Sequence, residues 1–385
     1  MWLENVEIVL PERVIPCGAL RIEDGKIAEI VETSGQGDLT VFPGFIDMHG
    51  DMVEQELEPR VQVDFPMDVA LNHLDARLAA SGVTTAYAAV SFSKGARDGE
   101  RRSFEHTSRL IGALRAARAT ARVDHRIHAR FDITFTAAIS ALETLLAEDM
   151  VDLVSVMDHT PGQGQYRNLE RHIELRAAHH GVSIEEARAM VQSRIERATP
   201  AEQVLVNLQV VSRLCRAAGV SLASHDDDTV EKSRLMADLG AVISEFPVTL
   251  EAAQEAKARG LMTAMGAPNA MRGQSYSGNL SARDAHAAGL LHILAADYHP
   301  AAILPAIRCL ASSDPDGLAG ATRLATANPA LALGLTDRGR IATGLRADLA
   351  IVDRSDRVRT TLRAGAVIYT NGEGRDPVQK TSIAA

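Results

Sequence analysis

The chain has 385 residues, of which 46% are hydrophobic, so it can bury a large core and is longer than one average domain. Its formal charge of −10 at pH 7 argues against nucleic acid or an anionic membrane as the main partner. It contains no run of about 18 apolar residues that predicts a transmembrane helix, and its start lacks the pattern of a secretory signal. Cys17, Cys215 and Cys309 lie far apart without a CxxC pair. This predicts buried free thiols in a cytoplasmic protein.

The two ends of the chain, residues 1–42 and 338–372, both read as short alternating strands separated by turns. An Asp24-Gly25 pair between two such strands is typical of a β-hairpin. Neither end has enough apolar residues for a core of its own, so we expect both to combine in one small β-sandwich. The polar residues 373–385 are expected to form a frayed tail.

Between the ends, residues 43–337 alternate between apolar, strand-like runs and helical stretches. The strand-like runs lie at residues 41–51, 82–90, 126–134, 152–160, 220–227, 241–247, 261–269 and 290–297. Near-continuous apolar strands that alternate with helices indicate parallel strands covered by helices, and eight such units predict a TIM (β/α)8 barrel of α/β class. An open doubly wound sheet is the alternative that this pattern leaves open.

Residues 166–219 form a charged, helical insertion into this alternation. Because it follows a strand end, it could form a lid or the surface of a homo-oligomer. A solvated helical excursion without such a role is the alternative.

Polar residues terminate most of the predicted barrel strands. In the first run, His49 and Asp51 are two residues apart, so their side chains project to the same side of an extended chain. A lone H-x-D is common by chance. Other strands also end in histidine or an acid, namely Asp132, Asp158, His159, His225, Glu245 and Asp297. On one face of a barrel these side chains would converge, and they are a suitable ligand inventory for two divalent metal ions.

Several polar residues have a plainer interpretation. Asp226, Asp227 and Asp228 precede a predicted helix, so some of them are expected to cap it. The histidines outside the predicted strand ends are interpreted as structural, namely His73, His125, His128 and His299.

The motifs around these strand ends resemble a known family. They are PGFIDMHGD (43–51), VMDHTPGQ (156–163), ASHDD (223–227), EFP (245–247), MGAPN (265–269), RGQSYSGN (272–279) and ADYHP (296–300). Together they resemble the amidohydrolase superfamily. Within it, the combination is most similar to the family of α-D-ribose 1-methylphosphonate 5-triphosphate diphosphatases of the carbon–phosphorus lyase pathway. The resemblance extends over nearly the whole chain.

This resemblance implies a metal-dependent hydrolase with two divalent ions of zinc, iron or manganese. The ligand positions that it implies are His49, Asp51, Asp132, His159, His225 and Asp297. Asp132 resembles the bridging carboxylate, and Asp297 would also accept the proton of the attacking water. The implied substrate is a small phosphorylated molecule, a ribose 5-triphosphate that carries a 1-phosphonate. Its binding residues would be Arg60, Glu245, Arg272 and Asn279.

Two other functions remain open from the sequence. A carbon–nitrogen hydrolase, such as a deacetylase or a cyclic-amide hydrolase, could use the same fold and metal ligands. A scaffold protein that kept the barrel and lost the metals is the third hypothesis, and the full set of candidate ligands argues against it.

Overall fold

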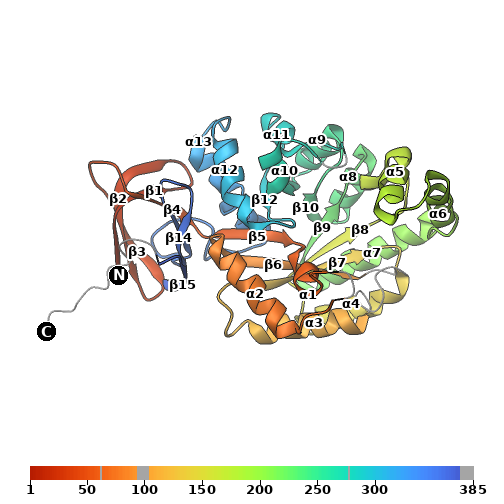
Figure 1. Cartoon of the computed structure of the whole chain (residues 1–385), viewed down its shortest axis with the longest axis horizontal. Coiled ribbons are helices and arrows are strands. Elements are labelled where there is room, and N and C mark those ends of the chain that lie inside the picture. The colour runs from red at the N-terminus through yellow and green to blue at the C-terminus, as the bar shows by residue number, and fades with distance from the viewer. Residues whose placement is uncertain (61–62, 93–103, 276–277, 373–385) are drawn as a thin grey trace.

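In a computed structural model, the chain forms a barrel and a separate small sheet beside it (Figure 1). The structure describes residues 1–60, 63–92, 104–275 and 278–372. The predicted tail, 373–385, therefore lies outside the described residues.

The small sheet takes strands from both ends of the chain, as predicted. Its strands are β1 (Trp2–Val9), β2 (Val14–Glu23), β3 (Lys26–Glu32), β4 (Leu39–Pro43), β13 (Leu349–Val352), β14 (Val358–Arg363) and β15 (Ala366–Thr370). The strand order β15-β14-β13-β4-β1-β2-β3 places β4 of the N-terminal part beside β13 of the C-terminal part. Apolar residues from both parts, such as Leu3, Ile27 and Ile351, form one buried cluster. The two ends thus share a core that neither could build alone.

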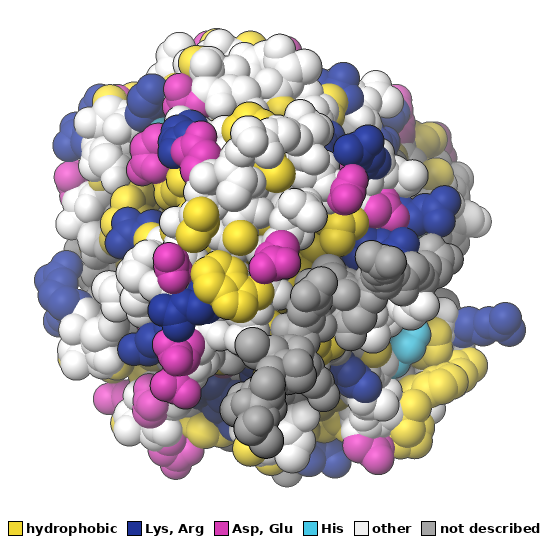
Figure 2. Space-filling view, turned by 90° about the vertical axis from the view of Figure 1, so that its left-hand side faces the viewer, with side chains coloured by type: hydrophobic (Ala, Val, Ile, Leu, Met, Phe, Trp, Pro, Cys, Tyr) yellow, Lys and Arg dark blue, Asp and Glu magenta, His cyan; other side chains and the backbone are white. Residues whose placement is uncertain are grey.

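The hairpin between β2 and β3 forms at the predicted pair. Asp24 and Gly25 have φ angles of 50° and 75°, and Glu23 pairs with Lys26 across the turn. Two successive positive φ angles are what a type I′ turn requires. On the face of the molecule that carries this sheet, basic and acidic side chains are interspersed (Figure 2), and Arg21 pairs with both Glu23 and Glu29.

Eight parallel strands form the barrel, which confirms the predicted fold. They are β5 (Phe45–Gly50), β6 (Val83–Phe92), β7 (Asp124–Asp132), β8 (Leu153–Met157), β9 (Ser221–His225), β10 (Ala241–Glu245), β11 (Met262–Gly266) and β12 (Ile293–Ala295). The strands are hydrogen-bonded in sequence order, and a parallel bridge between Gly50 and Asp297 joins the last strand to the first. This bridge closes the sheet, so the open doubly wound alternative is wrong.

Helices surround the barrel on its outer side. They are α1 (Met52–Leu57), α2 (Met67–Ala80), α3 (Phe104–Ala117), α4 (Ile139–Ala147), α5 (Leu169–His180), α6 (Ile184–Glu196), α7 (Ala201–Ala218), α8 (Val230–Asp238), α9 (Leu250–Ala258), α10 (Ala267–Arg272), α11 (Ala282–Ala287), α12 (Ile303–Ala311), α13 (Gly317–Arg323) and α14 (Ala327–Ala332). Because helices cover the strands, all ten residues of β6 are buried, which explains its near-continuous apolar sequence. Within the described part of the chain, no helix is long and apolar enough to cross a membrane.

The helical insertion consists of two kinds of helix. Helix α7 packs against α4 and β9 and belongs to the barrel. Helices α5 and α6 form a hairpin around a small core of their own, and they project at the right-hand edge of Figure 1. Gly181, with a φ of 61°, ends α5, and Ser183 and Glu186 form a capping box that starts α6. Whether this hairpin is a lid or an oligomer contact stays a prediction.

The three cysteines are free thiols, as predicted. Cys17 and Cys215 are buried, and burial raises the pKa of the Cys215 thiol to about 12. Cys309 is only partly buried.

An ion pair at the start of β7 ties the returning chain to the barrel. Arg338, which lies between α14 and β13, donates to Asp124 Oδ2 at 2.7 Å and to Thr85 Oγ1 at 2.9 Å. Burial alone would raise the pKa of Asp124, but the guanidinium groups of Arg126 and Arg338 lower it to about 2. The side chain of Asp124 is 11% exposed, so solvent screens these pairs little.

We predict that Asp124→Asn lowers the free energy of unfolding by about 2 kcal/mol at pH 7, from the linkage between this pKa shift and stability. The pKa of Asp124 in the folded protein lies below its ordinary value of 3.8. The carboxylate therefore stabilises the fold above about pH 4, and this contribution is lost as the pH falls towards about 2. Urea unfolding followed by circular dichroism at several pH values measures the effect. Asp38→Asn, at a side chain that is 83% exposed, is the control. A difference that is as large at pH 3 as at pH 7 would contradict the assignment.

Candidate active site

The closure of the barrel fixes three candidate side chains in one frame. The Asp297 N–H donates to the His49 carbonyl at 2.9 Å, and the Asp51 N–H donates to the Asp297 carbonyl at 2.7 Å. Below them, Asp47 Oδ1 accepts the N–H groups of Ala296 at 2.8 Å and His49 at 3.2 Å. The Asp47 carboxyl thus supplies the hydrogen-bond acceptor for the Ala296 N–H, directly after the three-residue strand β12. Burial raises the pKa of Asp47 to about 6.

Three residues that follow barrel strands have a left-handed backbone conformation. Asp226, Phe246 and Asp297 have φ angles of 54°, 53° and 57°. Each N–H donates to a carbonyl of the next strand around the barrel, on Glu245, Ala264 and His49 respectively. Such backbone angles are uncommon outside glycine and are found disproportionately at functional sites. They turn the chain away directly after His225 and Glu245.

Two histidines and a glutamate from three strands meet below the cavity floor. His49 Nδ1 lies 3.2 Å from Glu245 Oε2, and His128 Nε2 lies 3.4 Å from Glu245 Oε1. All three side chains are buried, and one donor atom of each falls within 4.8 Å of the others. Among the described residues, Glu245 Oε1 has no hydrogen-bond partner. A buried carboxylate oxygen without a partner indicates a ligand for another group.

The charges in this cluster are strongly coupled. Burial alone would raise the pKa of Glu245, but His128 and His49 lower it to about 2. Burial would likewise lower the pKa of His49, but the carboxylates of Asp51 and Glu245 outweigh it and raise the pKa to about 10. Burial lowers the pKa of His128 to about 3, so this imidazole is neutral.

The donor set fits a divalent metal ion. One nitrogen of each histidine and one carboxylate oxygen of Glu245 lie within 4.8 Å of one another, so the three residues could contact a single ion. Two imidazoles and a carboxylate suit zinc, iron or manganese. His49, His128 and Glu245 could therefore hold one such ion.

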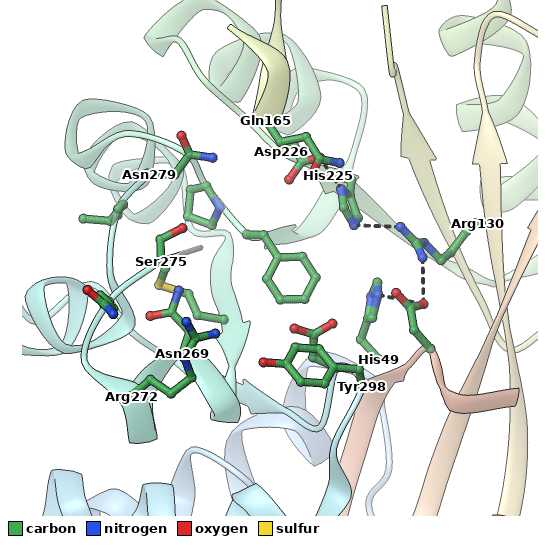
Figure 3. A pocket seen from close by; sticks show the side chains of 17 residues that line it. His49, Arg130, Gln165, His225, Asp226, Asn269, Arg272, Ser275, Asn279 and Tyr298 are labelled. Atoms are coloured by element: carbon green, nitrogen blue, oxygen red, sulfur yellow. Dashed lines mark hydrogen bonds and ion pairs between the residues drawn. The ribbon is translucent and has the colours of Figure 1, made fainter. Parts of the chain in front are cut away.

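Above this cluster, a cavity of about 250 Å³ opens at the carboxyl ends of the strands. Its lining includes Asp51, Arg130, His225 and Asp297 (Figure 3). Arg130 Nη1 donates to Asp51 Oδ1 at 2.7 Å, and Arg130 Nη2 lies 3.4 Å from His225 Nε2. Burial would raise the pKa of Asp51, but Arg130 and His49 hold it far below its usual range. The carboxylate of Asp51 is therefore ionised.

The acidic run after β9 does not cap the next helix, which corrects that expectation. Thr229 caps α8, because its side chain accepts the Lys232 N–H. Asp226 Oδ2 instead lies 3.0 Å from His225 Nδ1, and Asp227 accepts the hydroxyls of Ser224 and Ser244. The acids thus orient His225 and join β9 to β10.

The opposite wall of the cavity is polar and mostly uncharged. Helix α10 and the loop after it supply this wall, with Asn269, Arg272, Gln274, Ser275 and Asn279. In Figure 3, Arg272 lies across the cavity from Arg130. The Arg283 guanidinium holds α10 in place by donating to the carbonyls of Ala270 and Met271. Residues 276–277 of the RGQSYSGN motif lie outside the described residues.

The structure brings together most of the residues predicted from the sequence. His49, Asp51, His225, Asp297, Arg272 and Asn279 line the cavity, and Glu245 contacts His49 from below.

Besides Glu245, three predicted residues lie outside the cavity lining. Asp132 accepts the hydroxyl and the N–H of Thr134, and the His159 ring lies 6.5 Å from the His225 ring. Arg60 is exposed and forms an isolated bridge with Val63. The metal role of Asp132 and His159 and the substrate role of Arg60 stay predictions.

Two site residues were missed from the sequence. His128 was interpreted as structural, and Arg130 was not considered. Both share β7 with Asp132 at a spacing of two, so all three side chains point to the same face of the strand. That alternation was the available signal.

Known proteins similar to this chain were found by sequence and by structure, although no protein-family model matches it. The α-D-ribose 1-methylphosphonate 5-triphosphate diphosphatase of Escherichia coli (strain K12) is 37% identical over 368 residues, which cover 92% of this chain and 96% of that protein. The 5-methylcytosine deaminase from Klebsiella pneumoniae has a TM-score of 0.64 at 16% identity and covers 98% of this chain and 99% of its own. The N-acetyl-D-glucosamine-6-phosphate deacetylase from Mycobacterium smegmatis has a TM-score of 0.63 at 18% identity, with 96% and 99% covered. The two structural similarities establish the fold.

We predict that Asp47→Ala destabilises the barrel by about 2–6 kcal/mol, because two buried N–H groups each lose their acceptor at about 1–3 kcal/mol. Asp47→Asn is the matched control, since its amide oxygen can still accept both bonds. It should cost clearly less than the alanine variant. Thermal and urea unfolding of the two variants measure the difference, and equal losses would show that the acceptor role is wrong.

Proposed function

Because the chain belongs to the amidohydrolase superfamily and, within it, to the α-D-ribose 1-methylphosphonate 5-triphosphate diphosphatase family, we propose that it releases diphosphate from a ribosyl 5-triphosphate. The members of this family are hydrolases that act on phosphorus anhydrides. Water would cleave the anhydride bond between the α and β phosphorus atoms, leaving a 5-phosphate on the sugar and diphosphate as the second product. The proposed substrate carries a 1-phosphonate and belongs to phosphonate degradation. The observation that carries this proposal is the 37% identity to the Escherichia coli diphosphatase over 92% of the chain.

The charge distribution of the cavity supports a phosphorylated substrate. Arg130 and Arg272 both line it, and they approach the space between them from opposite walls. Guanidinium groups bind phosphate oxygens through paired N–H donors. The side-chain amides of Asn269, Gln274 and Asn279 provide further hydrogen-bond donors around the same space.

The metal-binding residues would be His49, His128 and Glu245, with zinc, iron or manganese as candidates. When bound, a divalent ion of this kind lowers the pKa of a water molecule and offsets negative charge on phosphoryl oxygens.

Asp297 is the residue that we propose accepts the proton of the attacking water. Its side chain lines the cavity, as do His49 and Asp51, and its backbone N–H and carbonyl are hydrogen-bonded to the backbone of His49 and Asp51 respectively. Burial raises the pKa of its carboxyl group, which makes it a stronger base than an exposed carboxylate. Asp51, held ionised by Arg130 and His49, remains an acceptor beside it.

Phosphorus-31 NMR of a ribosyl 5-triphosphate incubated with the protein and a divalent metal tests this function. We expect the signals of diphosphate and a 5-phosphate monoester to appear together at equal rates. The competing carbon–nitrogen hydrolase hypothesis predicts an unchanged phosphorus spectrum and turnover of an N-acyl or cyclic-amide substrate. A scaffold protein would turn over neither substrate.

We predict that Asp297→Asn lowers kcat by about a hundredfold to ten-thousandfold, the usual range for loss of a general base. The amide fills the same volume but cannot accept the proton. Asp228→Asn is the matched control, because Asp228 also follows a strand end but accepts the Gly164 N–H outside the cavity lining. Wild-type turnover by the Asp297 variant would remove this residue from the mechanism.

We predict that Arg272→Ala raises KM for the triphosphate about tenfold or more and changes kcat less, since a hydrogen bond to a charged group contributes about 1.5–3 kcal/mol. Steady-state kinetics measure both constants. Arg272→Lys should recover part of the affinity through its charge. Arg259→Ala, at the C-cap of α9 and paired with Glu255, is the control. An unchanged KM would exclude Arg272 from phosphate binding.

A further inference from the structure

Arg130 lies on one wall of the candidate active site. It extends from β7 and contacts Asp51, directly after β5, and His225, at the end of β9; Figure 3 shows Arg130 beside His225. Its side chain is only 12% exposed. The distances of 2.7 Å to Asp51 Oδ1 and 3.4 Å to His225 Nε2 leave both groups in direct contact with the guanidinium.

Asp51 and His225 are two of the side chains that a second divalent ion would need. A guanidinium cannot lose its charge in a protein. An ion bound to the same oxygen of Asp51 and the same nitrogen of His225 would stand against a permanent positive charge in a mostly buried setting. Such like-charge repulsion is weakly screened away from bulk water.

The other donor set adjoins this region, since Glu245 Oε2 lies 4.0 Å from His225 Nε2. His49 lies between Asp51 and Glu245: its Nε2 is 3.4 Å from Asp51 Oδ1, and its Nδ1 is 3.2 Å from Glu245 Oε2. Glu245 and His128, on the Nδ1 side, come from β10 and β7 and are completely buried. The contacts described for Arg130 go to Asp51 and His225, although its charge also lowers the pKa of His128.

We propose that this site holds one divalent ion, at His49, His128 and Glu245, and that the Arg130 guanidinium takes the place of a second ion between Asp51 and His225. The positive charge at this place is then fixed to β7 and does not depend on metal supply. The inference concerns metal stoichiometry, so it stands or falls independently of the substrate that the chain hydrolyses.

Metal counting tests the proposal. Chelator-stripped protein is loaded with excess zinc, separated by gel filtration and measured by inductively coupled plasma mass spectrometry. We expect about one ion per chain for the wild type and about two for Arg130→Gln, which removes the charge and frees both ligands. Arg130→Lys keeps a positive charge and should stay near one. Arg126→Gln, on the same face of β7 but paired with Asp124 and Asp152, is the matched control and should also stay near one.

Two results would overturn the proposal: about two ions in the wild type, or about one ion in a folded Arg130→Gln variant. If Arg130→Gln does not fold, two variants at the ligands decide the matter. Glu245→Gln should reduce the bound zinc well below one ion per chain, whereas Asp51→Asn should retain about one. The opposite pattern would place the ion at Asp51 and contradict the assignment.

Discussion

The site depends on the closure of the barrel between its first and last strands. Strand β12 has only three residues, and its contact with β5 rests on the backbone of Asp297 and the carboxyl group of Asp47. These few hydrogen bonds join residues separated by about 250 positions in the chain. They place His49, Asp51 and Asp297 in one rigid frame. Without closure, the first strand would carry a lone H-x-D and the last an isolated acid.

Charge compensation allows so many polar groups to be buried at this point. Glu245 is enclosed by His49 and His128, and Asp51 by His49 and Arg130. Each carboxylate thus faces positive or polarisable groups, which offset the cost of taking it out of water. The histidine between the two carboxylates connects the buried metal-binding set with the open cavity. The proposed metal ion and the substrate oxygens would thus occupy different parts of the site.

The fold could be predicted because eight apolar runs recur between helices and parallel strands buried on both faces need such runs. Residues at strand ends, such as His49, His225 and Asp297, could be found because barrel sites form at the carboxyl ends. His128 and Arg130 lie before the end of β7, where a polar side chain also reads as structural. Their role depends on which residues of β5 and β9 stand opposite, and this register is set by long-range pairing. Asp132 stands at a strand end but turns to Thr134, which no spacing rule shows.

The central claim is that the strand ends build a metal centre below a phosphate-binding cavity. Anomalous diffraction at the absorption edge of the bound metal tests it most directly. The account predicts one strong peak within bonding distance of His49, His128 and Glu245, with the Arg130 guanidinium still against Asp51. A peak between Asp132 and His159, with Glu245 left unligated, would contradict it.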